Sequence, residues 1–289
     1  MKPAAFAYCA PTSLDEAVRA LQAADGDGKV MAGGQSLMPL LNFRMTRPTM
    51  VVDLTKIPDL SFIEQRGDRV AIGALTRHAD LEFSALIAER LPVMSAAMPH
   101  VAHLAIRNRG TIGGSLSHAD PAAELPMLAV FYSATIRAQG PAGRRDIAAE
   151  DFFVSALATC LDPDEIVFEI EFPVLETHTG WAFEEVSRRF GDFALACIAL
   201  SIETRDGAIV DARVAVMGVA DTPLRLRDAE QALLGARGDA AAAFGAVVRG
   251  CVAPNSDIHV SADYRRALIG ALAEKAFTRA WQRAAGGPK

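Results

Sequence analysis

Two glycine pairs constrain this chain more than any other feature of its sequence. The first lies in Ala32-Gly33-Gly34-Gln35-Ser36 and the second in Thr111-Ile112-Gly113-Gly114-Ser115, and each segment ends in a serine. Glycine reaches backbone conformations closed to other residues, and a turn without side chains lets a ligand approach its N–H groups. Successive N–H groups in such a turn form a concavity that suits phosphate oxygens. Two such turns predict a site in which each turn binds one phosphate of a pyrophosphate. The expected ligand is therefore a dinucleotide.

Neither glycine segment matches the common nucleotide-binding motifs. No G-x-G-x-x-G opens a helix, and no Walker-type lysine follows either segment, so a Rossmann or P-loop site is not expected. A single glycine pair is more often only a tight turn. The prediction therefore depends on the occurrence of two such segments in one chain.

The residues around both glycine segments resemble a known family. The resemblance is carried by residues 32–42, by residues 107–126 with the sequence RNRGTIGGSLSHADPAAELP, and by a third block, SRRFGDFA, at 187–194. These blocks resemble the FAD-binding medium subunit of the molybdenum hydroxylases, the xanthine dehydrogenase family, and most of all its carbon monoxide dehydrogenase type. The resemblance extends over essentially the whole chain. It implies FAD as the cofactor.

The resemblance implies an α+β fold with a two-subdomain FAD-binding domain of the PCMH or vanillyl-alcohol-oxidase type, followed by a C-terminal domain. The expected boundaries are 1–57 and 58–175 for the FAD-binding subdomains and 176–289 for the C-terminal domain. Hydrophobic patterning within the last segment predicts a three-stranded antiparallel meander followed by helices, which is α+β texture. The strands are expected at 181–186, 195–203 and 209–219, and the helices at 228–234, 239–252 and 261–284.

Local signals predict several elements of the FAD-binding domain. Ser13 and Glu16 have the spacing of a capping box at the start of a helix. Thr76 is expected to cap a helix that runs to about Ala88, and residues 122–131 are expected to form a buried helix. Residues 166–172 alternate in the manner of a strand buried on one face.

The resemblance also implies which residues contact FAD. They comprise the first glycine segment with its flanks, the second with residues up to Glu124 after it, and four further positions. The full set is Val30, Met31, Ala32, Gly33, Gly34, Gln35, Ser36, Leu37, Ala102, Thr111, Ile112, Gly113, Gly114, Ser115, Ser117, His118, Asp120, Glu124, Val167, Glu184 and Phe193.

Four members of this set have specific expected roles. His118 directly follows the second glycine segment and either lies near FAD or orients the segment. Asp120 either contacts FAD or caps the helix that follows it, with Pro121 in the first turn. Glu184 stands where the family commonly has lysine, which removes a cation from that position. Phe193 matches a position near the isoalloxazine that is often tyrosine, so it keeps the aromatic wall without the hydroxyl.

Other chemistries find little support in the sequence. Ser36, Ser115 and Ser117 lie outside any G-x-S-x-G motif, which argues against a hydrolase. His100 and His103 lack a third metal ligand. The 4 cysteines are widely spaced without a C-x-x-C pair, so an iron–sulfur cluster would have to lie on another polypeptide. No catalytic or metal-binding residue is therefore assigned.

Composition narrows the cellular setting. A net charge of −6 without a basic cluster argues against nucleic acid as a partner. No uncharged apolar stretch long enough to cross a membrane is present, and the N-terminus lacks the apolar core of a signal peptide. Four scattered cysteines are typical of a reducing compartment, so a cytoplasmic location is expected.

The resemblance implies an electron-transfer subunit with two kinds of partner. A molybdopterin large subunit and a [2Fe-2S] small subunit are expected, assembled as a dimer of heterotrimers. Electrons would pass from the iron–sulfur clusters through FAD to NAD⁺, a quinone or oxygen. Two alternatives remain: a self-sufficient FAD-dependent oxidoreductase, and a scaffold that binds FAD only for assembly.

Overall fold

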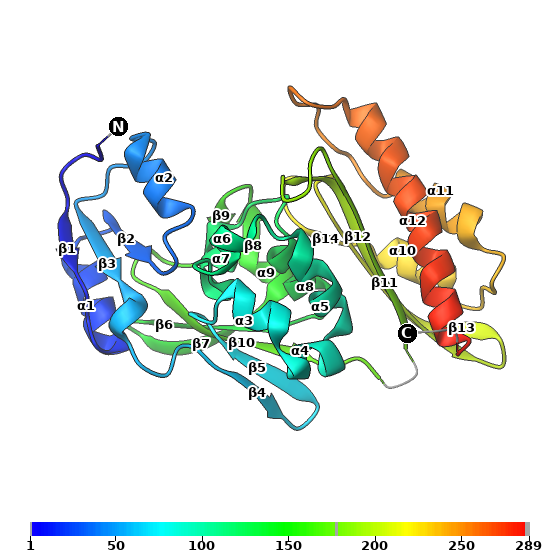
Figure 1. Ribbon diagram of the computed structural model, residues 1–289, viewed down its shortest axis with the longest axis horizontal. Helices are drawn as coiled ribbons and strands as arrows, with labels where there is room; N and C mark the ends of the chain where they lie inside the picture. Colours follow the sequence, from blue (N-terminus) through cyan, green and yellow to red (C-terminus); the bar gives the residue numbers. More distant parts are fainter. Residues whose placement is uncertain (1, 177–178, 287–289) are drawn as a thin grey trace. The chain divides into compact units, whose positions relative to one another are not determined.

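The computed structural model describes residues 2–176 and 179–286, and the chain divides into two compact units (Figure 1). The first unit comprises Met1–Leu86, His103–Ala119 and Ala134–Pro173. The second comprises Ile87–Ala102, Asp120–Ser133 and Val174–Lys289. Each unit is therefore built from segments that are distant in the sequence. The chain first passes from the first unit to the second within helix α4 (Ala85–Arg90).

The first unit begins with a small parallel sheet of order β1-β3-β2, formed by Ala7–Cys9, Met50–Asp53 and Gly28–Met31. Helix α1 (Leu14–Ala23) packs its apolar residues against this sheet. Ser13 caps α1 as expected, because its hydroxyl accepts the N–H of Glu16 at 3.2 Å. The Glu16 carboxylate instead accepts the N–H of Thr12 at 2.9 Å, one residue before its expected partner. The 3₁₀ turn η1 (Leu54–Lys56) follows β3.

A second, antiparallel sheet of order β4-β5-β10-β6-β7 completes the core of the first unit. Its strands are Ile63–Arg66, Arg69–Gly73, Ile166–Pro173, Thr135–Gly140 and Gly143–Ala148. Helices α7 and α9 pack on this sheet (Figure 1). The other small elements of the unit are α2 (Leu37–Asn42), α3 (His78–Phe83), α6 (Leu104–Arg107), α7 (Ile112–His118), α9 (Ala149–Phe152), β8 (Phe153–Ser155) and β9 (Ala158–Thr159).

Strand β10 differs from the expectation of burial on one face, because its acidic residues are buried too. Glu169 and Glu171 have only 7% and 9% of their surface exposed. Arg137 on the neighbouring β6 pairs with both carboxylates, at 2.7 Å from Glu171, and Arg66 pairs with Glu169 at 3.0 Å. Buried carboxylates are tolerated when cations and hydrogen bonds compensate their lost hydration. An alternating sequence therefore yields a strand buried on both faces.

Replacing Arg137 with methionine is expected to destabilise the first unit by about 2 kcal/mol. The change leaves Glu171 buried without its cation, although the arginine side chain is 29% exposed and its loss costs less than the ~3–5 kcal/mol of a fully buried pair. Urea unfolding measures the effect. Asp146→Asn is the matched control, because that carboxylate is 63% exposed and 3.4 Å from Arg137. Equal stability of the two variants would contradict the assignment.

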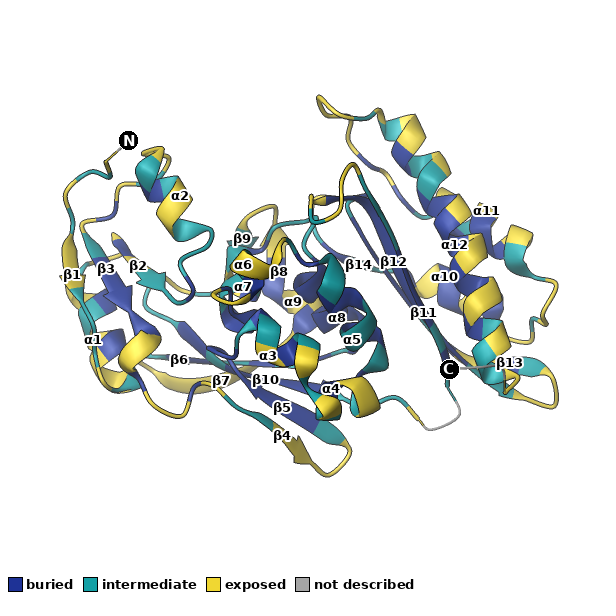
Figure 2. Ribbon diagram, in the orientation of Figure 1, coloured by how far each residue is buried: buried dark blue, intermediate teal, exposed yellow. Residues whose placement is uncertain are grey.

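The second unit is a single antiparallel sheet with helices on both faces (Figure 1). The sheet has the order β11-β12-β13-β14, with strands Gly180–Ser187, Ala194–Arg205, Ala208–Met217 and Leu224–Arg225. One face carries α10 (Arg227–Leu233), α11 (Ala241–Gly250) and α12 (Ala262–Ala284). The other carries α5 (Pro92–Ala97), the 3₁₀ turn η2 (Met98–His100) and α8 (Glu124–Phe131). Central strand β12 is buried along most of its length (Figure 2).

The expected meander gains one strand. Leu224 and Arg225 pair with Val216 and Ala215, so the sheet has 4 strands where 3 were expected. The two-residue strand has too little hydrophobic periodicity to be visible in the sequence. The three helices begin and end within two residues of their expected positions.

Two expectations for the first unit are wrong. Thr76 does not cap a helix: its hydroxyl donates to the carbonyl of Phe62 at 3.0 Å, and α3 starts at His78 and ends at Phe83. The second glycine segment is not a free turn. It forms the first turn of α7, with Thr111 as the N-cap residue.

Candidate functional site

The first glycine segment presents a row of backbone N–H groups. It connects β2 to α2, and Gly34 takes a left-handed conformation with φ of +71°. Within the described part of the chain, no hydrogen bond is donated by the backbone N–H of Gly33, Gly34, Gln35 or Ser36. Successive unpaired N–H groups around a left-handed residue form an anion-binding concavity. This segment therefore fits a phosphate group.

The second glycine segment has its N–H groups already bonded within the protein. Ile112 donates to the Thr76 carbonyl at 3.1 Å and Gly113 donates to the Ala74 carbonyl at 2.9 Å. Gly114 donates to the Thr111 hydroxyl at 3.2 Å, and Ser115 donates to the Thr111 carbonyl at 3.0 Å. These four donors are unavailable to a phosphate. We expected both segments to bind the pyrophosphate through backbone N–H groups. This arrangement does not fit the second segment.

The two glycine segments meet in the first unit. A Cβ atom placed on Gly33 would overlap the carbonyl oxygen of Arg109 and would lie 2.9 Å from the Cα of Gly110. A Cβ on Gly114 would come within 3.8 Å of the Ala32 side chain. Gly33 is therefore needed because the backbone of Arg109 and Gly110, directly before the second segment, packs on it. The second segment acts as a rigid support for the first.

A pocket of about 470 Å³ opens beside the first glycine segment. Asp53 and Arg109 bring opposite charges to its wall. Burial disfavours the Asp53 carboxylate, but hydrogen bonds from the Thr55 N–H and the Tyr8 hydroxyl outweigh this and lower its pKa. Met31, Ala32, Gly33, Gly34 and Gln35, all expected to contact FAD, line this pocket.

The remaining expected residues of the first unit lie in strands β2 and β10, at the start of α2 and at the end of α7. Val30 is in β2, Leu37 begins α2 and Val167 is buried in β10. Ser117 and His118 lie at the end of α7, with Ser117 exposed.

The other five expected residues belong to the second unit. Ala102 adopts an unusual left-handed conformation with φ of +45°, and Phe193 is 66% exposed in the turn before β12. The Asp120 carboxylate accepts the N–H of Ala122 at 2.9 Å. Asp120 therefore shapes the approach to α8, but α8 begins at Glu124 after Ala123, so Asp120 is not its cap and Pro121 is outside it.

The two glutamates of this group are buried. Glu124 is 6% exposed in the first turn of α8. Glu184 is 4% exposed on the face of β11 that α12 covers, where Lys275 lies 2.8 Å from its carboxylate and Arg279 also pairs with it. Two cations of α12 thus compensate the buried carboxylate. A contact between Glu184 and FAD stays a prediction.

Sequence reasoning missed two residues at the glycine segments. Arg109 lines the pocket beside the first segment, and His78 packs against Gly110 at the start of the second. The only signal for Arg109 was its place in the Arg107-Asn108-Arg109-Gly110 run. His78 carries no sequence signal, because its position depends on the pairing of distant segments.

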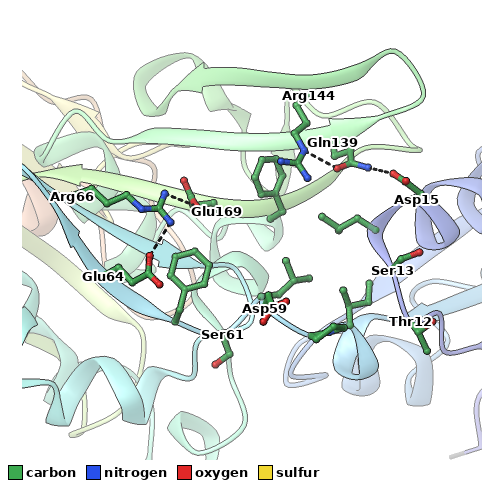
Figure 3. Close-up of a pocket in the computed structure, with 16 residues that line it drawn as sticks. Thr12, Ser13, Asp15, Asp59, Ser61, Glu64, Arg66, Gln139, Arg144 and Glu169 are labelled. Carbon is green, nitrogen blue, oxygen red and sulfur yellow. Dashed lines mark hydrogen bonds and ion pairs between the residues drawn. The ribbon is translucent and has the colours of Figure 1, made fainter.

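A larger pocket of about 850 Å³ in the first unit holds a paired polar network (Figure 3). Arg144 donates to Gln139 at 3.0 Å, and Gln139 donates to Asp15 at 2.5 Å. On the other side, Arg66 bridges Glu64 and Glu169. None of the residues expected to contact FAD lines this pocket.

All 4 cysteines are free, and Cys197 is the one that is buried. Burial, with Glu185, Glu124 and Glu184 nearby, raises the pKa of its thiol. Among residues 2–176 and 179–286, no group of three or more histidine, cysteine or acidic side chains is placed to hold a metal ion. Within those same ranges, no helix is long and apolar enough to span a membrane.

Comparison with known proteins assigns the chain to a family. Residues 4–175 match the FAD-binding domain in molybdopterin dehydrogenases, and residues 181–280 match the C-terminal domain of CO dehydrogenase flavoproteins. The chain is 43% identical to the 6-hydroxypseudooxynicotine dehydrogenase complex subunit alpha of Paenarthrobacter nicotinovorans, over 98% of this chain and 97% of that one. It is 36% identical to the carbon monoxide dehydrogenase medium chain of Hydrogenophaga pseudoflava, over 99% and 100% of the two chains.

Solved structures agree with the sequence relatives. Carbon monoxide dehydrogenase from Hydrogenophaga pseudoflava superposes with a TM-score of 0.94 at 37% identity, over 98% of this chain and 99% of that chain. Quinoline 2-oxidoreductase from Pseudomonas putida 86 also gives 0.94, at 36% identity over 98% and 99% of the chains. The chain therefore belongs to the FAD-binding medium subunits of the molybdenum hydroxylases. The expected family, α+β fold class and FAD cofactor are confirmed.

Proposed function

We propose that this chain is the electron-transferring FAD subunit of a cytoplasmic molybdenum hydroxylase complex. The observation that carries the proposal is the first glycine segment, where four consecutive N–H groups lack partners in the described chain and Arg109 lies beside them. An anion site of this kind suits the pyrophosphate of FAD. Bound FAD supplies hydride and one-electron chemistry, while the chain supplies binding and orientation.

Within this proposal the two glycine segments have different tasks. The N–H groups of Gly33 to Ser36 bind phosphate oxygens, and Arg109 adds a positive charge that strengthens the interaction. The segment from Thr111 to Ser115 fixes the first segment in place, with the Thr111 hydroxyl as the cap of α7, and Ser115 offers its hydroxyl to the cofactor. The other residues implied by the family resemblance complete the FAD site. The domain boundaries after residues 57 and 175 likewise remain part of the proposal.

The acid beside the first segment has a structural task. The Asp53 carboxylate, which lines the pocket, accepts the Thr55 N–H at 2.9 Å and the Tyr8 hydroxyl at 2.7 Å. Within this proposal, substrate oxidation belongs to a molybdopterin large subunit. A small subunit with [2Fe-2S] clusters then delivers electrons to FAD, from which they pass to NAD⁺, a quinone or oxygen.

Exposed apolar side chains in each unit support the proposed assembly. Phe43, Met45 and Leu104 of the first unit are 66%, 74% and 54% exposed. In the second unit, Phe190 and Ile258 are 69% and 94% exposed. Large apolar side chains on a surface are typical of protein interfaces when they cluster. We propose that such side chains contact the partner subunits, in a dimer of heterotrimers.

Purification from the native host tests the proposed assembly. We expect this chain to co-purify with one chain that carries molybdenum and another that carries iron and acid-labile sulfide. The same chain produced alone is expected to bind FAD but no iron, molybdenum or zinc, because its cysteines are unclustered. Stoichiometric iron and sulfide in the singly produced chain would contradict the proposal. Purification from the host without any partner would favour the scaffold or the self-sufficient oxidoreductase.

A further inference from the structure

His78 is a buried histidine at the base of the second glycine segment. Its side chain lies within the first unit, and the residue is 6% exposed. A Cβ atom placed on Gly110 would lie 2.8 Å from the Cε1 and 2.9 Å from the Nδ1 of the His78 ring. The imidazole therefore occupies the space that a side chain at position 110 would need.

The segment around His78 holds the second glycine segment through backbone hydrogen bonds. The His78 N–H donates to the Gly110 carbonyl at 3.0 Å, and Thr76 and Ala74 accept the N–H groups of Ile112 and Gly113. Arg77 Nη1 donates to the Arg109 carbonyl, the same carbonyl that faces Gly33. A continuous set of contacts thus connects the His78 ring, through Gly110 and Arg109, to the phosphate-binding N–H groups of the first segment.

The surroundings of the ring favour its uncharged form. Both ring nitrogens are buried without a well-formed hydrogen bond, and the backbone of Thr111 is the one polar group close enough to interact weakly with the ring among the described residues. The charged groups nearest to it are Arg77 at the start of α3 and Arg107 in α6. Two acids of α3 are already engaged: Glu82 pairs with Arg107 at 2.7 Å, and Asp80 accepts the Arg77 N–H at 3.2 Å. A proton on His78 would therefore place a third positive charge in an enclosed space without a free carboxylate.

These contacts give the charge of the His78 ring an effect on the FAD site. We propose that uncharged His78 is a positioning residue that holds the second glycine segment against the first, so that protonation of this single ring loosens FAD. The proposal rests on the FAD site proposed above. It makes the affinity for FAD dependent on acidity without any titrating group that touches the cofactor.

The direction of the pH dependence follows from the pKa of the ring. Burial lowers the pKa of His78 from 6.5 to about 4, Arg107 and Arg77 act in the same direction, and the backbone of Thr111 opposes them in part. When the glycine segments separate, the ring regains its ordinary pKa. Protons therefore favour the separated state, and FAD affinity is expected to be full above pH 6.5 and to fall as the pH drops towards 4. Between pH 6.5 and pH 4 these two pKa values favour the separated state by roughly 80-fold, which is the largest loss of FAD affinity that this ring can cause over that range.

Fluorescence titration of the whole chain with FAD at several pH values tests the proposal. We expect the wild type to lose affinity by up to roughly 80-fold between pH 6.5 and 4. His78→Phe, which keeps a ring but cannot be protonated, is expected to bind FAD at neutral pH and to lose most of this acid-dependent decrease. His103→Phe is the matched control: His103 is an exposed histidine of the same unit, and its loss is expected to leave the decrease unchanged.

A second measurement reports on the glycine segments without FAD. Hydrogen exchange of the Ile112 and Gly113 amides is compared between wild type and His78→Phe at each pH. We expect the wild type to lose protection relative to the variant as the pH falls towards 4. This result would support the role of His78 even if FAD proved to bind elsewhere. Equal exchange and an equal acid-dependent loss of FAD in the two proteins would overturn the proposal.

Discussion

Replacing Gly33 with valine is expected to abolish FAD retention. The new Cβ would occupy the position of the Arg109 carbonyl oxygen, and backbone on that side cannot move without breaking the hydrogen bonds that hold the second glycine segment. The two segments would separate, and the N–H groups of residues 33–36 would lose their arrangement. We expect at least a 100-fold weaker affinity for FAD, which corresponds to about 2.7 kcal/mol.

Flavin content after purification and FAD titration measure this effect. Gly250→Val is the matched control, because no atom lies within 4 Å of a Cβ at that position and its φ is not in the left-handed region. The control is expected to retain FAD like the wild type. Circular dichroism should show that the secondary structure of the Gly33 variant is preserved. A yellow Gly33→Val protein with normal flavin absorbance would contradict the assignment of the site.

Gly114→Val is expected to act by a different route. A Cβ at Gly114 would lie 2.8 Å from the Thr111 hydroxyl, which caps α7, so a branched side chain would displace the cap of the helix. The sequence pattern treats both glycine pairs as equivalent. The structure distinguishes them. The N–H groups of the first pair are available, whereas those of the second donate hydrogen bonds to Thr76, Ala74 and Thr111.

Local signals identified most secondary structure correctly. Ser13 marks the start of α1, and the apolar periodicity of the C-terminal segment locates β11, β12, β13 and the three helices. Such signals depend on neighbours in the sequence, so they are readable without the fold. Thr76 shows the limit of this reasoning. Its sequence suits a helix cap, but a distant partner, Phe62, takes its hydroxyl.

The parts of the site that the sequence did not reveal depend on distant contacts. His78 and Arg109 become important only because α3 and the segment after α6 meet at Gly110. The burial of Glu171 likewise depends on Arg137, which lies on another strand. The family resemblance could supply FAD and its expected contacts, but it could not show that the second glycine segment is a support for the first.

The second large effect concerns catalysis, which the isolated chain is expected to lack. The acid of the pocket beside the first glycine segment, Asp53, is held by hydrogen bonds from the Thr55 N–H and the Tyr8 hydroxyl. Under the proposed relay function, the organic substrate is oxidised on a partner subunit and not on this chain. Adding substrate to the purified, FAD-loaded chain is therefore expected to leave the flavin oxidised. Dithionite should still reduce it, which shows that the flavin itself is competent.

Anaerobic flavin absorbance, followed after addition of the substrate that the native complex oxidises, tests the central claim most directly. The FAD-loaded chain alone is expected to show no reduction, and the same chain mixed with the molybdenum and iron–sulfur subunits is expected to be reduced. Gly33→Val, mixed in the same way, should give no flavin signal. Rapid reduction of the flavin in the isolated chain by substrate would contradict the account and identify a self-sufficient oxidoreductase.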